Sequence, residues 1–446
     1  MDKAFINERE IAINIVMDIQ RDALFNNLAL KKALEENELT KGQRGIVTEL
    51  VNGVLRNKIY IEYCINMVSK TPTEKMKPFI LSLLLCSCYE IMYMKTEVAF
   101  VCNEAVNLTK KKGFKNLAPF VNGVLRNFGR GFENKEFELI EGKDKLSYLS
   151  LKYSYPKWLV GYWNKYYGDK VEYICDFLNT SPRVSIAINK HKTNKDTLKK
   201  ELEKESVIVI DGKVAENSLL LKNTSNLGHN KNFINGDFWV MDESSQKALD
   251  FIDFSSLDEK ATVLDLCASP GGKSFYIKCN LPKETKIISC DIFPHKIELL
   301  EKGFKRMGFE NYEVMLNDAT LLNEKLINCA DLLLVDAPCS GFGLLRKKPD
   351  IKYTKDYEDI LALQKVQLNI LDISKKYIKD KGVIVYSTCT LSYLENELVI
   401  EEFLKNNKEF VCEHIETFLP MSQNTEYKGY ESDGFFVAML RKVNNG

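Results

Sequence analysis

The sequence VLDLCASPGGK, at Val263–Lys273, joins an apolar run to a turn with two adjacent glycines. Because glycine has no side chain, a strand-to-helix turn of this kind lets the backbone approach a ligand closely. The helix that follows offers free backbone N–H groups to the same ligand. The stretch has neither the Gly-x-Gly-x-x-Gly spacing of a dinucleotide site nor that of a P-loop. It predicts the first strand, turn and helix of an α/β domain that binds some other ligand.

Further short apolar runs follow this stretch at regular intervals. The five predicted strands are Thr262–Leu266, Lys286–Cys290, Tyr312–Leu316, Asp331–Val335 and Gly382–Tyr386. Helical stretches separate them, the longest being Tyr357–Lys379. This alternation is typical of a parallel sheet covered by helices on both faces. Residues 237–446 are therefore predicted to form a doubly wound α/β domain whose ligand lies at the carboxyl ends of the strands.

Acidic residues follow two more strands at positions suited to a nucleoside. Asp291 lies 20 residues after Gly271, at the end of the second strand, where a carboxylate can accept hydrogen bonds from ribose hydroxyls. Asp318 follows the third strand, where an adenine amino group could be read. The turn and these residues together predict a nucleoside cofactor. The predicted cofactor-binding residues are Cys267 (through its backbone), Ala268, Ser269, Pro270, Gly271, Gly272, Lys273, Asp291, Asp318 and Asp336.

Two cysteines follow the fourth and fifth strands. Cys339 lies in the motif DAPCSG, which begins at Asp336, and Cys389 lies in YSTCT. Since neighbouring parallel strands end at one edge of a sheet, we expect both thiols to face one crevice beside Asp336. Such a group suits covalent catalysis on an electrophilic ring. A cysteine more often acts as a small buried hydrophobe. We predict that role for Cys64, Cys86, Cys88, Cys102, Cys175, Cys279, Cys290, Cys329 and Cys412.

These motifs resemble those of the RNA cytosine-C5 methyltransferases, which use S-adenosylmethionine. The matching segments are Leu264–Lys273, Asp336–Gly341 and Ser387–Cys389. Two departures are minor: Ser269 stands where alanine is usual, and Tyr393 where proline is usual before the motif ENE at residues 395–397. The resemblance implies a Rossmann-like methyltransferase domain with a nucleophilic cysteine.

The resemblance also implies a role for each catalytic residue. Cys389 would attack C6 of cytosine, Cys339 would assist removal of the C5 proton, and Asp336 would hydrogen-bond the base, the cofactor or both. Lys273 would hold the substrate or polarise the ring, or else be a surface lysine at the start of a helix. The basic stretch LRKKPD at Leu345–Asp350 is expected to contact backbone phosphates. The target base must be taken from a loop or flipped out of its stack.

The first 140 residues have helical periodicity throughout. The heptapeptide VNGVLRN occurs at Val51–Asn57 and again at Val121–Asn127, which predicts a duplicated helical unit with a glycine at each close helix contact. We favour internal pairing for the arginine of each copy. The pattern resembles the NusB domain, an all-helical RNA-binding module. The lysine cluster at Lys110–Lys115 is either a phosphate contact or a solvated surface.

Residues 145–235 have a different character, with one helix among strand-like runs. The predicted order is strand Arg183–Ile188, helix Lys195–Glu205, and strands Val207–Ile210 and Leu219–Leu221. This order suits a small α+β module, which we predict positions the substrate. Three domains are therefore expected, at residues 1–140, 145–235 and 237–446.

Composition narrows the class of protein. The 446 residues are 45% hydrophobic and 28% charged, which excludes disordered, collagen-like and small disulfide-linked proteins. The most apolar window, Phe79–Met94, is too short for a membrane span and is predicted to be a buried helix. No export signal precedes it, so a cytoplasmic protein is expected. The 12 cysteines are then expected to be free thiols, and with only 4 histidines no metal site is predicted.

The net charge is zero, but residues 1–235 carry 36 basic against 28 acidic residues. That excess fits either an anionic partner or ordinary surface variation. As a whole, the chain resembles bacterial methyltransferases of small-subunit ribosomal RNA. This resemblance implies that small-subunit ribosomal RNA is the partner. The protein is expected to be a monomer. Two alternatives stay open: transfer RNA as the substrate, or an RNA-binding assembly or antitermination factor with a vestigial methyltransferase domain.

Overall fold

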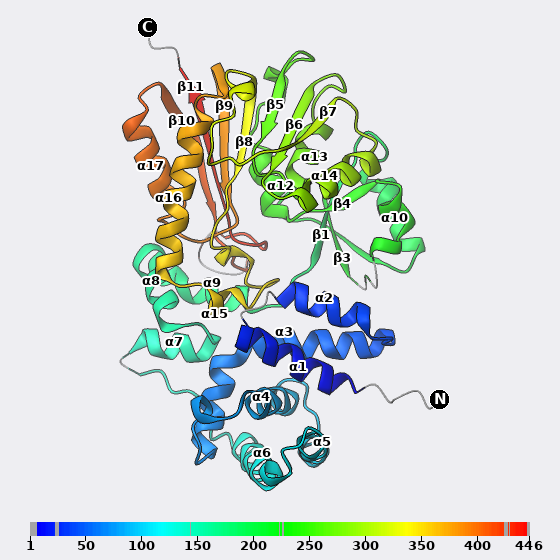
Figure 1. Ribbon diagram of the computed structural model, residues 1–446, viewed down its shortest axis with the longest axis vertical. Helices are drawn as coiled ribbons and strands as arrows, with labels where there is room; N and C mark the ends of the chain where they lie inside the picture. The colour runs from blue at the N-terminus through cyan, green and yellow to red at the C-terminus, as the bar shows by residue number, and fades with distance from the viewer. Residues whose placement is uncertain are drawn as a thin grey trace. The chain divides into compact units, whose positions relative to one another are not determined.

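The computed structural model describes residues 7–22, 26–142, 144–222, 224, 227–422, 427 and 429–443 (Figure 1). The chain forms two compact units. Unit 1 comprises Met1–Asn179 and Lys347–Thr354, and unit 2 comprises Thr180–Arg346 and Lys355–Gly446. The division into three domains made from the sequence stays a prediction. Among the described residues, no helix combines the length and the apolar composition needed to cross a bilayer.

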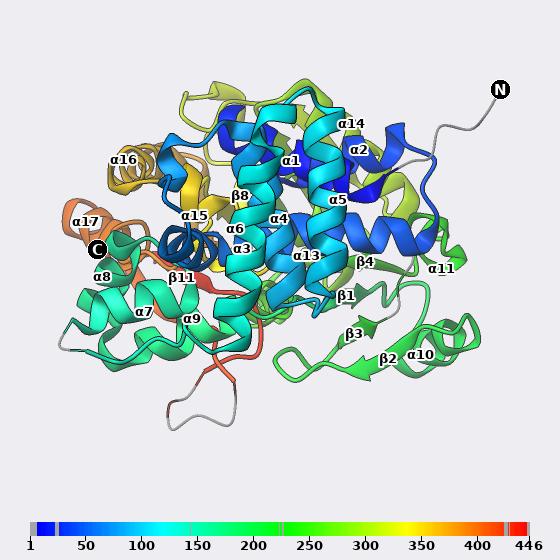
Figure 2. The same ribbon diagram turned by 90° about the horizontal axis from the view of Figure 1, so that it is seen from below.

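Unit 1 is helical, which confirms the prediction for the first 140 residues. Its α-helices are α1 (Glu8–Asp22), α2 (Asn26–Glu36), α3 (Lys41–Val68), α4 (Pro78–Met92), α5 (Val98–Lys111), α6 (Ala118–Glu133), α7 (Lys145–Tyr153), α8 (Lys157–Tyr167), α9 (Val171–Leu178) and α15 (Ile351–Thr354). Figure 2 shows α5 and α6 lying side by side. The predicted buried helix is α4, whose single carboxylate, Glu90, is buried and pairs with Arg9 at 2.8 Å.

The two copies of VNGVLRN fall on α3 and α6 and have diverged in environment. Gly53 packs directly against the ring of Tyr89, as predicted, whereas an added Cβ at Gly123 would meet no heavy atom within 4 Å. The expected close contact at Gly123 is therefore wrong, because the face of α6 that carries it is exposed. Arg56 is buried, whereas Arg126 is exposed and bonds to Asn122 of its own helix.

A short segment of the C-terminal half belongs to unit 1. Lys352 of α15 is 1% exposed, and its ammonium group donates to the carbonyl oxygens of Arg56 at 2.7 Å and Ser154 at 2.6 Å. Burial lowers the pKa of Lys352 well below its usual value. The Tyr353 hydroxyl donates to the Leu55 carbonyl at 2.8 Å. Three main-chain carbonyls of unit 1 thus hold this segment in place.

Unit 2 begins with a small antiparallel sheet of order β2-β3-β1-β4. Its elements are β1 (Val184–Ile188), α10 (Lys195–Lys204), β2 (Ile208–Asp211), β3 (Ser218–Lys222), α11 (Lys231–Ile234) and β4 (Phe238–Val240). The predicted order strand–helix–strand–strand is confirmed. Strand β4 was not predicted, because its three residues are too few to show the alternation of a strand.

The second sheet has seven strands in the order β10-β11-β9-β8-β5-β6-β7. Its strands are β5 (Thr262–Asp265), β6 (Lys286–Asp291), β7 (Tyr312–Leu316), β8 (Ala330–Asp336), β9 (Ile378–Thr388), β10 (Phe410–Phe418) and β11 (Phe435–Lys442). The five predicted strands are confirmed and are parallel. The antiparallel strands β10 and β11 were not predicted.

Helices cover both faces of this sheet, as the alternation of strands and helices predicts (Figure 1). The helices are α12 (Glu243–Leu249), α13 (Gly272–Cys279), α14 (Pro294–Met307), α16 (Tyr357–Ser374) and α17 (Glu397–Asn406). Successive residues of a strand point to opposite faces. Val263 lies in the core that contains Phe275 of α13, and Leu264 lies in the core that contains Leu371 of α16.

Two expectations about this part of the chain are corrected. The helix predicted to reach Lys379 ends at Ser374, and β9 begins at Ile378. The charged run between them has neither glycine nor proline to mark the boundary, and the buried ring of Tyr377 fixes it instead. Cys412 was expected to be buried but is exposed on the edge strand β10.

The paired glycines of the repeat give a test of stability. Gly53→Ala would bring a Cβ to 2.0 Å from Cζ of Tyr89, so we expect the free energy of unfolding to fall by about 1–3 kcal/mol. Gly123→Ala enters open space on a helix and should raise it by roughly 0.5–1 kcal/mol. Urea unfolding followed by far-ultraviolet circular dichroism compares the two variants. Equal shifts in both would contradict the difference in packing.

Candidate active site

The carboxyl ends of the parallel strands surround a cavity of about 340 Å³, a size typical of small-molecule sites. Five of the predicted cofactor residues line it, whereas Ala268, Pro270, Gly271, Gly272 and Lys273 do not. The lining residues are Leu266, Cys267, Ser269, Asp291, Ile292, Phe293, Lys296, Asn317, Asp318, Ala319, Thr320, Asp336, Pro338, Val366 and Ile370. The structure thus brings together the turn and the acidic residues of three strand ends.

The glycine turn requires its glycine. Gly271 has φ +108°, and a Cβ there would lie 2.3 Å from the ring of Phe275. The turn is held to the neighbouring strand by a bond from the Ala268 N–H to the Cys290 carbonyl at 2.8 Å. The Ser269 N–H donates to Oδ2 of Asp291 at 3.3 Å. The same carboxylate therefore lines the cavity and fixes the turn beside it.

The acidic lining of the cavity suits a nucleoside, because carboxylates accept hydrogen bonds from hydroxyl and amino groups. The carboxylates of Asp291, Asp318 and Asp336 face it, and the exposed apolar side chains of Ile292 and Phe293 form part of its wall. Asp318 also accepts the N–H and hydroxyl of Thr320, at 2.9 and 2.6 Å, in its own turn. The sequence analysis missed Ile292 and Phe293, although an apolar pair directly after a strand-end acid was a visible signal.

Asp265 is a second residue that the sequence analysis missed. It ends β5 and is 0% exposed; Oδ2 accepts the Ser274 hydroxyl at 2.6 Å, while Oδ1 is buried with no partner among the described residues. Burial raises its pKa to about 7. An aspartate within the otherwise apolar run VLDL was the sequence signal that this carboxyl group is buried.

The two predicted catalytic thiols lie together. Cys389 directly follows β9 and Cys339 follows β8, and their sulfur atoms are 3.4 Å apart. The adjacent Cys389 sulfur and burial raise the pKa of Cys339 well above its usual value. Two thiolates at this distance would repel each other. The pair therefore carries at most one negative charge, with the remaining thiol able to donate a hydrogen bond to it.

Asp336 lies beside the pair in an ion pair of its own. Lys273 Nζ is 2.6 Å from Oδ2 of Asp336, and the Ser387 hydroxyl donates to Oδ1 at 2.9 Å. Burial lowers the pKa of Lys273, but the charge and hydrogen bond of Asp336 outweigh it, so that pKa is raised. The Lys273 side chain is 14% exposed. The alternative of a surface lysine is therefore wrong.

The two basic stretches named as phosphate contacts are partly engaged within the protein. Arg346 is 9% exposed and donates to the Ser181 carbonyl at 3.0 Å. Lys111 and Lys112 both pair with Glu10, at 2.6 and 2.9 Å. These three side chains have partners within the protein, and because Arg346 is buried, the expectation of a phosphate contact is not supported there.

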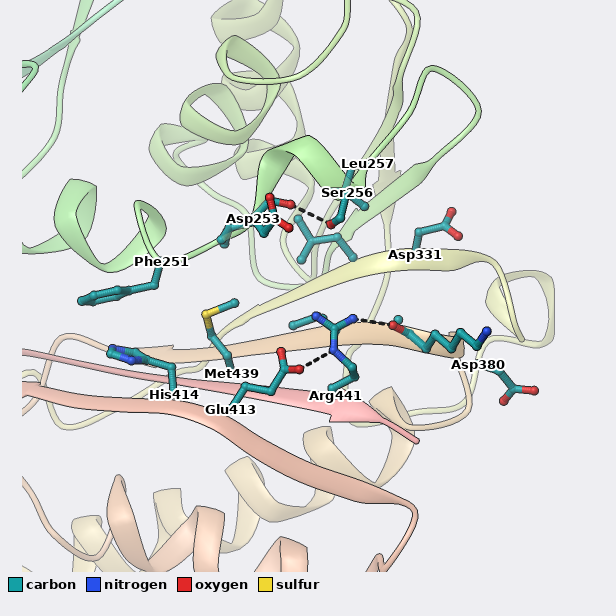
Figure 3. Close-up of a pocket in the computed structure, with 15 residues that line it drawn as sticks. Phe251, Asp253, Ser256, Leu257, Asp331, Asp380, Glu413, His414, Met439 and Arg441 are labelled. Carbon is teal, nitrogen blue, oxygen red and sulfur yellow. Dashed lines mark hydrogen bonds and ion pairs between the residues drawn. The ribbon is translucent and has the colours of Figure 1, made fainter. Parts of the chain in front are cut away.

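A second cavity, of about 450 Å³, lies near the amino ends of β8 and β9, at the opposite edge of the sheet (Figure 3). Arg441 crosses it, paired with Glu413 at 2.5 Å and donating to the Lys381 carbonyl at 2.7 Å. All predicted site residues are described, and none of them lines this cavity. The candidate active site is therefore the cavity at the carboxyl ends of the parallel strands.

Comparison with known proteins identifies the family of the chain. A family model described as 16S rRNA methyltransferase RsmB/F matches residues 254–441, the NusB family matches residues 6–130, and a ferredoxin-like domain of RsmF/B-like methyltransferases matches residues 155–227. The probable ribosomal RNA small subunit methyltransferase B of Bacillus subtilis is 35% identical, over 97% of this chain and 98% of its own. The chain belongs to the RsmB/F methyltransferase family.

Other members of the RsmB/F family align over the same length. Ribosomal RNA small subunit methyltransferase B of Proteus mirabilis is 27% identical, over 99% of this chain and 100% of its own. Among solved structures, the crystal structure of PH0851 has a TM-score of 0.78 at 22% identity, over 99% of this chain and 100% of that one. That likeness supports the fold.

Asp265 predicts a pH dependence of stability. Its pKa is about 7 in the folded protein and about 3.9 when unfolded. Between these values the folded state holds a proton that the unfolded state lacks. The free energy of unfolding therefore falls as pH rises, by about 1.4 kcal/mol per pH unit from this residue.

Asp265→Asn has no such proton, and its free energy of unfolding should fall less steeply between pH values of about 4 and 7. Urea unfolding at a series of pH values measures both slopes. Parallel curves for the two proteins would show that Asp265 is ionised in the folded state.

Proposed function

We propose that this protein transfers a methyl group from S-adenosylmethionine to C5 of a specific cytidine in small-subunit ribosomal RNA, through a covalent adduct between Cys389 and C6. The observation that carries the proposal is the 3.4 Å separation of the Cys339 and Cys389 sulfur atoms, beside a nucleoside-sized cavity. Membership of the RsmB/F family supports the ribosomal RNA substrate, because its relatives are named as methyltransferases of small-subunit ribosomal RNA.

The cavity fits the proposed cofactor. Asp291 and Asp318 would accept hydrogen bonds from its ribose and adenine, and Ile292 and Phe293 would pack against the base. Asp318 would also attract a ligand with positive charge, whereas Asp291 and Asp336 are already paired with Lys296 and Lys273. When bound, S-adenosylmethionine supplies an electrophilic methyl group on a sulfonium.

The first half of the reaction activates the ring. C5 of cytosine is a poor nucleophile, and attack on C6 by the Cys389 thiolate forms a C6–S bond and moves electron density to C5. The Cys339 thiol, within hydrogen-bond distance, stabilises the thiolate before attack. The Lys273–Asp336 pair presents both a donor and an acceptor to the edge of the base. These residues orient the ring over the Cys389 sulfur.

The second half releases the product. After methylation, a base must remove the C5 proton; the C–H electrons then restore the C5–C6 double bond and the C6–S bond breaks. Cys339 is the proposed base. Attack converts Cys389 into a neutral thioether, which removes the largest cause of the raised pKa of Cys339. Cys339 therefore becomes easier to ionise at the step that requires a base.

The substrate assignment is tested by methyl transfer from labelled S-adenosylmethionine to deproteinised small-subunit ribosomal RNA, with transfer RNA in parallel and bisulfite mapping of the product. We expect label at one cytosine of the ribosomal RNA. Label on transfer RNA alone would retain the chemistry and change the substrate. Label on neither RNA, nor on precursor particles, would favour the alternative of an RNA-binding factor without methyltransferase activity.

The roles of the two thiols are tested by single substitutions. Cys389→Ala should reduce transfer to below about one thousandth, because no nucleophile remains, and should leave cofactor affinity unchanged. Cys339→Ala should accumulate an RNA–protein adduct that survives denaturing electrophoresis. Normal turnover by Cys389→Ala would refute its assignment as nucleophile.

A further inference from the structure

The residues that flank Cys339 are both bound to one pair of buried side chains. Glu395, which is 0% exposed, accepts the Ser340 N–H at 2.8 Å through Oε1 and the Ser340 hydroxyl at 2.6 Å through Oε2. Gln367 of α16 donates both to Oε1 of Glu395 at 3.2 Å and to the Pro338 carbonyl at 2.9 Å. Pro338 and Ser340 are the chain neighbours of Cys339, so this pair fixes the backbone on either side of that thiol.

The next residue holds the chain neighbours of the other thiol in the same way. Asn396, also 0% exposed, accepts the Thr388 hydroxyl at 2.6 Å and donates to the Thr390 carbonyl at 3.0 Å. Thr388 and Thr390 flank Cys389. The Ser340 and Thr390 hydroxyls, 2.7 Å apart, connect the two groups. Two consecutive residues thus hold the two catalytic loops, one residue for each cysteine.

The chemical types of these residues fit that task. A carboxylate has two oxygens and accepts from an N–H and an O–H at once, whereas the Asn amide both accepts and donates. Burial raises the pKa of Glu395, and its hydrogen bonds oppose that effect. Burying a carboxylate away from water costs free energy, which is offset here by hydrogen bonds from the residues around Cys339 and from Ser392.

We propose that Glu395 and Asn396 are positioning residues that act on different halves of the reaction, Asn396 by placing Cys389 for attack on C6 and Glu395 by placing Cys339 for removal of the C5 proton. The inference rests on the function proposed above. Losing Asn396 frees the segment around Cys389, and adduct formation slows. Losing Glu395 frees the loop of Cys339; Cys389 keeps its place after β9, so the adduct forms but is released slowly.

The test uses the full-length protein, S-adenosylmethionine and end-labelled, deproteinised small-subunit ribosomal RNA. Adduct is measured by denaturing electrophoresis and 5-methylcytosine by nucleoside mass spectrometry. For Glu395→Ala we expect release to slow by about 10–100-fold with adduct accumulating, and for Asn396→Ala a loss of similar size in adduct formation with none accumulating. Glu395→Gln keeps the acceptor for the Ser340 N–H and should restore most of the release rate.

Glu397→Ala is the matched control. Glu397 is a partly buried carboxylate two residues away that accepts from Thr417 at 2.7 Å and makes no described bond to either cysteine loop. It should change stability without accumulating adduct. Circular dichroism and calorimetric titration of S-adenosylmethionine establish that each variant is folded. If Glu395→Ala or Asn396→Ala does not fold, Ser340→Ala and Asn396→Asp take their places.

The possible outcomes distinguish failure of this inference from failure of the proposed function. If the wild type makes no 5-methylcytosine and Cys339→Ala traps no adduct, the proposed function fails. The inference is overturned if Cys339→Ala traps adduct but the Glu395 and Asn396 variants are slowed at the same step. It is also overturned if neither variant is slowed in adduct formation or in release. Accumulation in the Glu395 variant alone, together with rescue by glutamine, supports it.

Discussion

The parallel register of β8 and β9 is the constraint on which the site depends. Asp336 pairs with Ser387 across these strands, and the two cysteines follow a few residues later on each chain segment. Residues before this point alternate between the two apolar cores on either face of the sheet. A slip of one residue would exchange the faces of a whole strand. The same burial that stabilises the sheet therefore sets the distance between two thiols 50 residues apart.

Asp336 joins the two parts of the site. It lines the nucleoside-sized cavity, and its ion pair with Lys273 lies next to the loop that carries Cys339. Because Lys273 lies in the first turn of α13, directly after the glycine turn, one half-buried ion pair connects the turn, the cavity and the segment that carries Cys339. In the proposed reaction, methyl donor and nucleophile would approach the base from regions that share this carboxylate.

Much of this arrangement could be predicted from sequence, because parallel strands place their carboxyl ends at one edge. Asp291, Asp318 and Asp336 follow three such strands, and that topology alone brings them together. The bonds of Glu395 could not be predicted, since they join segments 55 residues apart and leave no local period. The two copies of the repeat have the same sequence, which predicted the same packing for both. Residues outside the repeat decide that Gly53 packs against another side chain and Gly123 does not.

The connectivity of the chain bears on how the protein can be dissected. Residues 347–354 leave unit 2, form part of unit 1 and return, so the polypeptide passes between the units three times. Removing the helical region at residue 179 would strand the Lys352 ammonium without the carbonyls of Arg56 and Ser154. Cutting the chain at residue 179 would therefore also divide unit 1, because residues 347–354 remain on the other fragment. A fragment that begins at residue 180 would keep Lys352 but lose both carbonyls, so this side chain would be exposed to water and residues 347–354 would lose the helices that hold them.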